Sequence, residues 1–239
     1  MDNPKLQGKM AVDRMAKAPS AAVIFHGAAS DADGIFALTA KLRLNPRQRA
    51  TLVPSAPYLL DDRGPMSPFA GGDLEQDLDV LTFSGPKRAF SWLPMKETIS
   101  DEEIAATADT IDRYLDGWLR PENVGNPEDV LFVGFCQGAS LALHVALRQS
   151  RPCAGLVLFS GPVLVPELEV KARPPVCVIH GDADPFFPPE TLTETVDFLR
   201  KAGLEPESHL LPGLGHCIDS RGVAIARDFI ARRLAAPRS

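Results

Sequence analysis

The segment Gly134-Phe135-Cys136-Gln137-Gly138 decides the fold, because it stands between an apolar run and a run rich in Ala and Leu. It has the form G-x-S-x-G, a sharp turn from a strand into a helix that exposes a nucleophile, with cysteine in place of serine. Because glycine lacks a Cβ atom, Gly134 and Gly138 let neighbouring backbone pass close to this turn. A helix that begins directly after Cys136 also favours the thiolate form of the cysteine. The segment predicts a nucleophilic cysteine at a strand–helix turn.

Two motifs further along the chain supply an acid and a histidine: HGDADP at residues 180–185 and GLGH at residues 213–216. Nucleophile, acid and histidine in this chain order are typical of α/β-hydrolases and differ from the order in other triad enzymes. We expect His216 to act as general base toward the cysteine, with Asp184 accepting a hydrogen bond from its Nδ1–H. Asp182 competes with Asp184, which we favour because the following proline suits a loop that turns back toward the histidine. An isolated G-x-C-x-G would fit an ordinary tight turn equally well, but the three motifs together predict a catalytic triad.

An oxyanion hole is expected from two backbone N–H groups. One is that of Gln137, and the other comes from the loop after the first apolar strand, residues 25–29, where Ala28 is the candidate. His26 in the same loop is expected to be structural and to tie loops together by hydrogen bonds. The apolar side chains of Trp92, Phe186 and Phe187 are expected near the mouth of the site as a substrate pocket. Two further apolar residues are expected beside them, Leu93 and Met95.

The hydrophobic pattern predicts an α/β fold. Short continuous apolar runs suit the central strands of a parallel sheet, and they occur at residues 21–25, 129–135, 155–160 and 175–180. Helical patterns lie at residues 101–119, 137–148, 192–202 and 223–234. This alternation predicts a single-domain α/β-hydrolase fold over residues 1–239, with a doubly wound, mostly parallel sheet and helices on both faces. Residues 1–20 are expected to form an N-terminal extension. Residues 52–94, rich in Pro and Gly, are expected to form a long excursion that lies over the sheet edge and the active site.

Composition narrows the classes of function. The chain has 239 residues, 45% of them hydrophobic, and a net charge of −6, which argues against nucleic acid as a partner. Its first 20 residues contain no apolar signal segment and no stretch is long enough to span a bilayer, so we expect a cytoplasmic protein without membrane insertion. The four cysteines show no metal-ligand spacing. There is no P-loop and no dinucleotide fingerprint, so neither a metal nor another cofactor is expected.

The chain resembles the phospholipase/carboxylesterase family of α/β-hydrolases, which includes acyl-protein thioesterases. The resemblance covers about residues 21–220 and lies in the segments VIFHG at 23–27, PSAP at 54–57, GFCQG at 134–138, HGDAD at 180–184 and GH at 215–216, together with Trp92. It implies a triad of Cys136, Asp184 and His216, with oxyanion donors at Ala28 and Gln137. The departure is the nucleophile, since members of this family normally carry serine there.

The substituted nucleophile leaves several interpretations open. The first is a hydrolase of esters or thioesters that acts through an acyl-enzyme on Cys136. The second is a lactonase similar to dienelactone hydrolases, which use cysteine at the elbow and would need cationic side chains, for which Arg63, Lys87 and Arg88 are available. The third is a non-catalytic binding protein with the same fold. A separate possibility is that cysteine replaces a native serine in this motif. The expected partner is a small-molecule ester, thioester or lactone. The oligomeric state stays open, although related folds often form homodimers.

Overall fold

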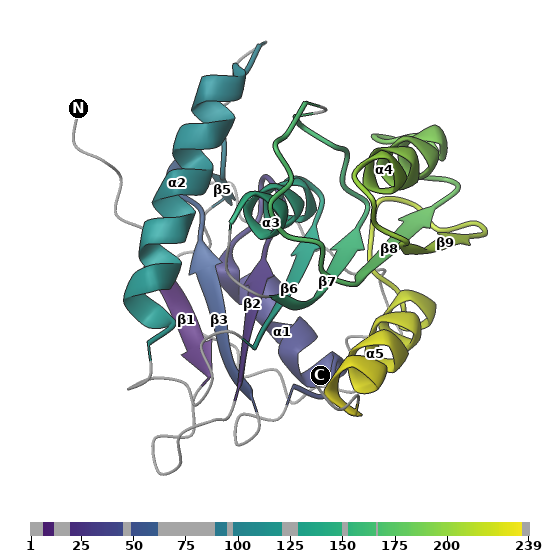
Figure 1. Ribbon diagram of the computed structural model, residues 1–239, viewed down its shortest axis with the longest axis horizontal. Helices are drawn as coiled ribbons and strands as arrows, with labels where there is room; N and C mark the ends of the chain where they lie inside the picture. Colours follow the sequence, from purple (N-terminus) through teal and green to yellow (C-terminus); the bar gives the residue numbers. More distant parts are fainter. Residues whose placement is uncertain are drawn as a thin grey trace.

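The computed structural model describes residues 7–11, 20–44, 49–61, 89–94, 98–120, 129–149, 153–165 and 167–235. Its main sheet has seven strands in the spatial order β1-β3-β2-β6-β7-β8-β9 (Figure 1). These strands are β1 (Gln7–Ala11), β2 (Ser20–Phe25), β3 (Arg49–Ser55), β6 (Val130–Phe135), β7 (Cys153–Phe159), β8 (Val176–Gly181) and β9 (Glu207–Leu211). All neighbours pair in parallel except β1, which runs antiparallel to β3. The predicted mostly parallel sheet is therefore confirmed.

Helices cover both faces of the sheet, as a doubly wound fold requires (Figure 1). The five helices of the described residues are α1 (Ala32–Lys41), α2 (Asp101–Trp118), α3 (Gln137–Arg148), α4 (Glu190–Lys201) and α5 (Ser220–Ala235). Alternate side chains of a strand point to opposite faces. In β2, Val23 packs in the core with α2, α3 and α4, whereas Ile24 packs in the core with α1 and α5.

The central strands follow the predicted apolar runs because they are buried on both faces. Every residue of β2, β6 and β8 is buried, so no alternation of polar and apolar residues appears in their sequences. The predicted helix after Ser100 is also present. Ser100 caps α2 in a capping box, with its hydroxyl accepting from the Glu103 N–H and the Glu103 carboxylate accepting from the Ser100 N–H.

Two peripheral regions differ from the expectation. Part of the predicted N-terminal extension forms strand β1, and the start of the predicted excursion, Leu52 to Ser55, belongs to β3. Within that excursion, β4 (Tyr58–Asp61) and β5 (Ala89–Ser91) pair as a separate two-stranded sheet. The prediction that the excursion covers the active site concerns mainly residues 62–88, which lie outside the described residues.

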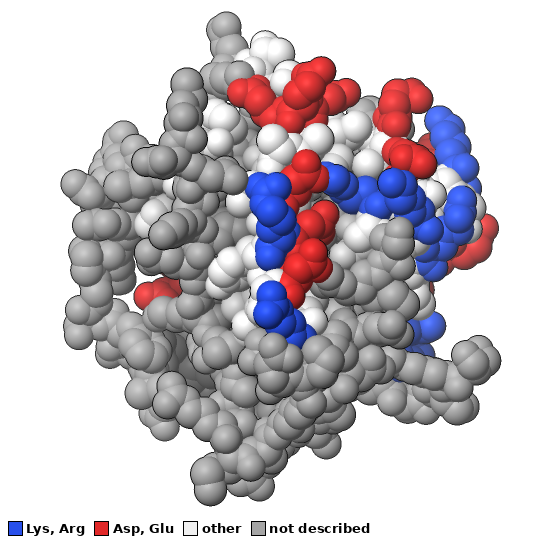
Figure 2. Space-filling model, turned by 60° about the vertical axis from the view of Figure 1, so that its left-hand side comes forward, with Lys and Arg blue, Asp and Glu red and all other residues white. Residues whose placement is uncertain are grey.

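The surface of the described residues mixes charges of both signs. Figure 2 shows one face on which acidic and basic side chains lie next to one another in short stripes. An ion pair between Arg148 of α3 and Asp109 of α2 ties these two helices together. Among the described residues, no helix is long and apolar enough to cross a membrane.

Candidate active site

The turn between β6 and α3 places Cys136 in a strained backbone conformation. Its φ is 55° and its ψ is −127°, a region that residues with a Cβ atom rarely adopt. Such a conformation costs about 1–3 kcal/mol and persists only where the surroundings enforce it. Here the Cys136 N–H donates to the carbonyl of Phe159 at the end of β7 (2.9 Å), and its carbonyl accepts from the Ala139 N–H (2.9 Å). The turn therefore has the geometry predicted for a nucleophile elbow.

Close backbone packing explains the two glycines of the motif. A Cβ atom on Gly134 would lie 2.5 Å from the Gly138 carbonyl oxygen, and one on Gly138 would lie 2.3 Å from the His26 carbonyl oxygen. A third glycine, Gly161 after β7, was not singled out from the sequence. Its Cβ would lie 2.7 Å from the Cys136 carbonyl oxygen, so it belongs to the same packed turn.

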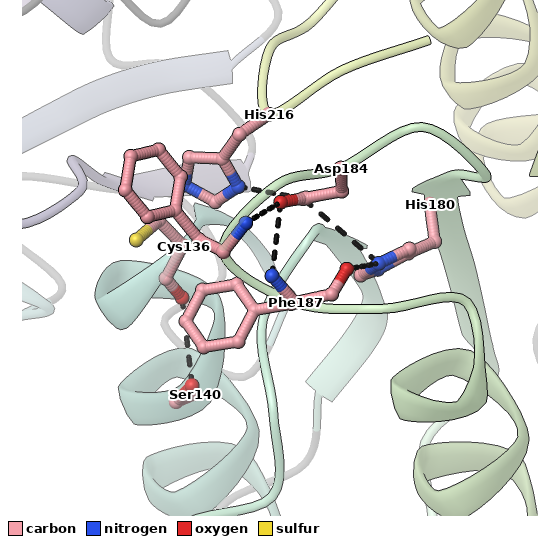
Figure 3. Close-up of polar contacts among 7 residues, drawn as sticks. Cys136, Ser140, His180, Asp184, Phe187 and His216 are labelled. Atoms are coloured by element: carbon pink, nitrogen blue, oxygen red, sulfur yellow. Dashed lines mark hydrogen bonds and ion pairs between the residues drawn. The ribbon is translucent and has the colours of Figure 1, made fainter. Parts of the chain in front are cut away.

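The loops after β8 and β9 bring Asp184 and His216 together beside Cys136 (Figure 3). The His216 Nδ1 lies 2.7 Å from Asp184 Oδ2, and the Asp184 side chain has no exposed surface. The other carboxylate oxygen accepts from the N–H groups of Phe186 (2.9 Å) and Phe187 (3.0 Å). Because these bonds fix the carboxylate, they also fix the orientation of the imidazole.

Asp182, the competing acid, lies elsewhere. Its Oδ1 accepts from the Gly213 N–H at 2.6 Å, so it joins the loop after β8 to the loop after β9. His180 lies on the far side of Asp184, with its Nε2 2.9 Å from the Phe187 carbonyl oxygen and 3.9 Å from Asp184 Oδ2. Among the described residues, Asp184 alone of the two candidate acids is hydrogen-bonded to His216.

The surroundings of His216 change its basicity. Burial by itself would lower the pKa of His216, but hydrogen bonds and negative charge at Cys136 and Asp184 outweigh burial and raise that pKa above its ordinary value. Three aromatic rings enclose the imidazole, with centroids at 4.9 Å for Phe135, 5.2 Å for Phe186 and 5.4 Å for Phe187. An imidazole between a thiol and a buried carboxylate is suited to accept a proton from the thiol.

The loop after β2 lies directly against the elbow. A Cβ on Gly27 would be 3.1 Å from Cys136 Cβ, so the next residue, Ala28, is close to the same turn. Within the described residues neither predicted oxyanion donor, the Ala28 N–H or the Gln137 N–H, has an acceptor, and their role stays a prediction.

His26 is a structural residue, as expected. Its Nδ1 lies 2.7 Å from the Gly27 carbonyl oxygen and its Nε2 accepts from the Ala56 N–H at 3.0 Å. The His26 side chain has no exposed surface, and this burial lowers the pKa of His26 to about 4, although the hydrogen bond to Gly27 opposes the shift. The ring is therefore neutral at physiological pH and ties the loop after β2 to the end of β3.

The prediction that Trp92 and Leu93 lie at the mouth of the site is wrong. Trp92 has 0% exposed surface and Leu93 has 1%, and both belong to the core cluster that also contains residues of α2 and α3. Phe186, by contrast, is 63% exposed beside His216, and Phe187 is half-buried. Met95 and the cationic candidates Arg63, Lys87 and Arg88 lie outside the described residues.

The structural role of the Gln137 side chain was not predicted. Its Oε1 accepts from the Trp92 N–H (2.7 Å) and the Ser91 hydroxyl (3.0 Å), so it joins the elbow to the segment after β5. The only signal in the sequence was a long polar side chain within the glycine-flanked motif at residues 134–138. No cluster of three metal-ligating side chains occurs within the described ranges.

Comparison with known proteins agrees with this arrangement. The family model described as phospholipase/carboxylesterase matches residues 78–234. The chain belongs to the phospholipase/carboxylesterase family. This membership accounts for the strand order and for the elbow between β6 and α3, and it confirms the resemblance found in the sequence.

Individual relatives of this phospholipase/carboxylesterase chain are distant. Acyl-protein thioesterase 1 of Neurospora crassa is 28% identical over 148 residues, which are 58% of this chain and 60% of that protein. Carboxylesterase SOBER1 of Arabidopsis thaliana is 30% identical over 115 residues, 46% of this chain and 50% of the relative. The matches therefore span half to three-fifths of these relatives. Among solved structures, esterase PE8 has a TM-score of 0.75 at 26% identity, covering 95% of this chain and 99% of the other.

Proposed function

We propose that the protein hydrolyses carboxylic esters or thioesters through an acyl-enzyme on Cys136. The observation that carries the proposal is the hydrogen bond of 2.7 Å between His216 and the buried Asp184, made by an imidazole that lies beside Cys136 (Figure 3). Membership of the phospholipase/carboxylesterase family and the names of its relatives support this class of substrate.

The chemistry assigns one role to each group. His216 takes the thiol proton, and the Cys136 sulfur attacks the substrate carbonyl to form a tetrahedral intermediate. The N–H groups of Ala28 and Gln137 stabilise the oxyanion, and Asp184 holds the imidazole and stabilises its charged form. His216 then protonates the departing alcohol or thiol. Finally it activates a water molecule that hydrolyses the thioester and frees the acid.

The cysteine restricts the substrates. Because a thiolate is a good leaving group, a tetrahedral intermediate formed from an unactivated alkyl ester returns to substrate. Activated esters and thioesters, whose own leaving groups are comparable, proceed to the acyl-enzyme. The exposed ring of Phe186 and the half-buried ring of Phe187 provide apolar surface beside His216, which suits an apolar group on the substrate.

Hydrolysis of p-nitrophenyl acetate and butyrate tests the proposal, with the wild type compared with Cys136→Ser, Cys136→Ala and a control, Cys217→Ser. Cys217 neighbours His216 in the chain, so its replacement controls for the loss of any thiol near the site. We expect sustained turnover in the wild type and the control, and none in Cys136→Ala. A single stoichiometric burst in the wild type with turnover only in Cys136→Ser would show that the cysteine traps the acyl group. Turnover that survives in Cys136→Ala would refute the nucleophile.

A further inference from the structure

We propose that Trp92 and the Gln137 side chain form a brace that sets the separation of the two oxyanion donors, the N–H groups of Ala28 and Gln137. This inference rests on the proposed function, because it concerns the geometry of the same oxyanion hole. It assigns positioning roles to two side chains that do not touch the substrate.

One end of the brace is at the elbow. The Gln137 side chain accepts a hydrogen bond of 2.7 Å from the Trp92 backbone N–H. A second bond of 3.0 Å comes from the Ser91 hydroxyl, which also lies 2.7 Å from the Leu93 carbonyl oxygen. Ser91, the residue before the backbone donor, therefore helps to fix the same segment through its side chain.

The other end of the brace is at the loop after β2. The indole N–H of Trp92 donates to the His26 carbonyl oxygen at 2.7 Å. The Trp92 ring is held in place by an edge contact with Phe25 (5.4 Å between centroids) and by the His26 ring (5.0 Å). Since Ala28 follows His26 by two residues, this bond acts directly on the loop that carries the second donor.

The loop after β2 and the start of α3 also pack directly against each other. The His26 carbonyl oxygen would be 2.3 Å from a Cβ atom on Gly138, so the loop and the first turn of α3 are already in backbone contact. Trp92 is hydrogen-bonded on both sides of this contact, through its indole N–H to His26 and through its backbone N–H to the side chain of Gln137, which precedes Gly138. A single buried residue thus connects both halves of the oxyanion hole.

A backbone donor depends on such support more than a side chain does. An N–H group has no rotamer of its own, so its direction follows the backbone that carries it. Because the stabilisation of an oxyanion depends on donors held about 2.7–3.1 Å from the developing charge, a small displacement reduces the rate without weakening substrate binding. Displacement of a group by about 1 Å costs up to about 10²-fold in rate.

Three variants test the brace. Trp92→Phe keeps most of the ring but removes the indole donor, Gln137→Met removes the acceptor but keeps the backbone N–H, and the third variant combines both. The control is Ile111→Val, which trims a residue with 1% exposure in the same core cluster as Trp92 and breaks no hydrogen bond. The readouts are kcat and KM with p-nitrophenyl butyrate, the Ki of a trifluoromethyl ketone that forms a tetrahedral adduct, and the melting temperature.

We expect each single variant to lose about tenfold in kcat with KM within about twofold, and the Ki of the ketone to rise in parallel. Because the two links act in series, the double variant is expected to lose no more kcat than the worse single variant. The control is expected to lose melting temperature but not kcat. Unchanged kcat in both single variants with a lower melting temperature would overturn the inference, as would additive losses in the double variant.

Amide hydrogen exchange separates this inference from the proposed function. In both single variants we expect faster exchange at two protected amides beside the donors, the Ala56 N–H bonded to His26 and the Ala139 N–H bonded to the Cys136 carbonyl, whether or not the wild type turns over an ester. If the wild type were inactive and exchange rose at both amides, the hydrolase proposal would fail and the brace would stand. If exchange at either amide stayed at the wild-type rate, the brace would fail.

Discussion

Acid destabilises this fold through His26, and the size of the effect follows from its burial. In the folded state the pKa of His26 is lowered from 6.5 to about 4, mainly because the ring is fully buried. The unfolded chain therefore binds a proton between these values that the folded chain does not. It follows that stability is complete above pH 6.5 and falls as the pH decreases toward 4.

The magnitude can be worked from the two pKa values. At pH 5.0 the unfolded state is almost fully protonated at this site and the folded state is not, which lowers the free energy of unfolding by about 2 kcal/mol relative to pH 7.5. Below pH 4 the loss from this one histidine reaches about 3 kcal/mol. In a protein with ordinary stability this is a measurable fraction of the total.

The assay is urea unfolding at pH 7.5 and 5.0 for the wild type and His26→Gln, which keeps an acceptor for the Ala56 N–H but does not titrate. His144 also has a pKa lowered to about 4, chiefly by burial, but it is present in both proteins and cancels in the difference. We expect His26→Gln to be less stable than the wild type at pH 7.5. The difference in their free energies of unfolding should decrease by about 2 kcal/mol at pH 5.0, because only the wild type loses stability through this site. Equal slopes of stability against pH in both proteins would refute the reasoning.

Three further predictions concern the site and its surroundings. Because the Asp184 carboxylate helps to raise the pKa of His216, Asp184→Asn should lower kcat by up to about 10⁴-fold and move the acid limb of the kcat/KM profile to lower pH, measured with p-nitrophenyl butyrate. Gly161→Ala places a Cβ 2.7 Å from the Cys136 carbonyl oxygen, so urea unfolding should show a loss of about 1–3 kcal/mol. Burial raises the pKa of the Cys177 thiol to about 12, so mass spectrometry should find it unlabelled by iodoacetamide at pH 7 until the protein unfolds.

The central strands were predictable because a strand that is buried on both faces is a continuous apolar run in the sequence. The run at residues 129–135 is continuous and apolar, and it forms β6 at the centre of the sheet. Helix α1 was missed for a specific reason. Asp31 caps this helix by accepting from the Gly34 N–H at 2.7 Å, and the short acidic stretch that does so looks like a loop in the sequence.

Edge elements were missed because their partners define them. Within the described residues β1 pairs with β3 alone, and β4 pairs with β5 across residues 62–88. Neither has a hydrophobic pattern of its own that would distinguish it from a loop. The burial of Trp92 also depends on partners that are distant in the sequence. Its hydrogen bonds go to Gln137, 45 positions later, and to His26, 66 positions earlier.

The histidines show most clearly where the sequence stops being informative. His26 directly follows β2 and His180 is the second-last residue of β8, and each precedes a glycine. Because His216 follows a glycine after β9, the local sequence does not separate the three histidines. Their environments do. His26 is fully buried with backbone partners alone, and its pKa falls, whereas the pKa of His216 rises beside a thiol and a carboxylate. Since His26 is neutral wherever His216 can act as a base, the loop that His26 holds does not titrate over the working range of the triad.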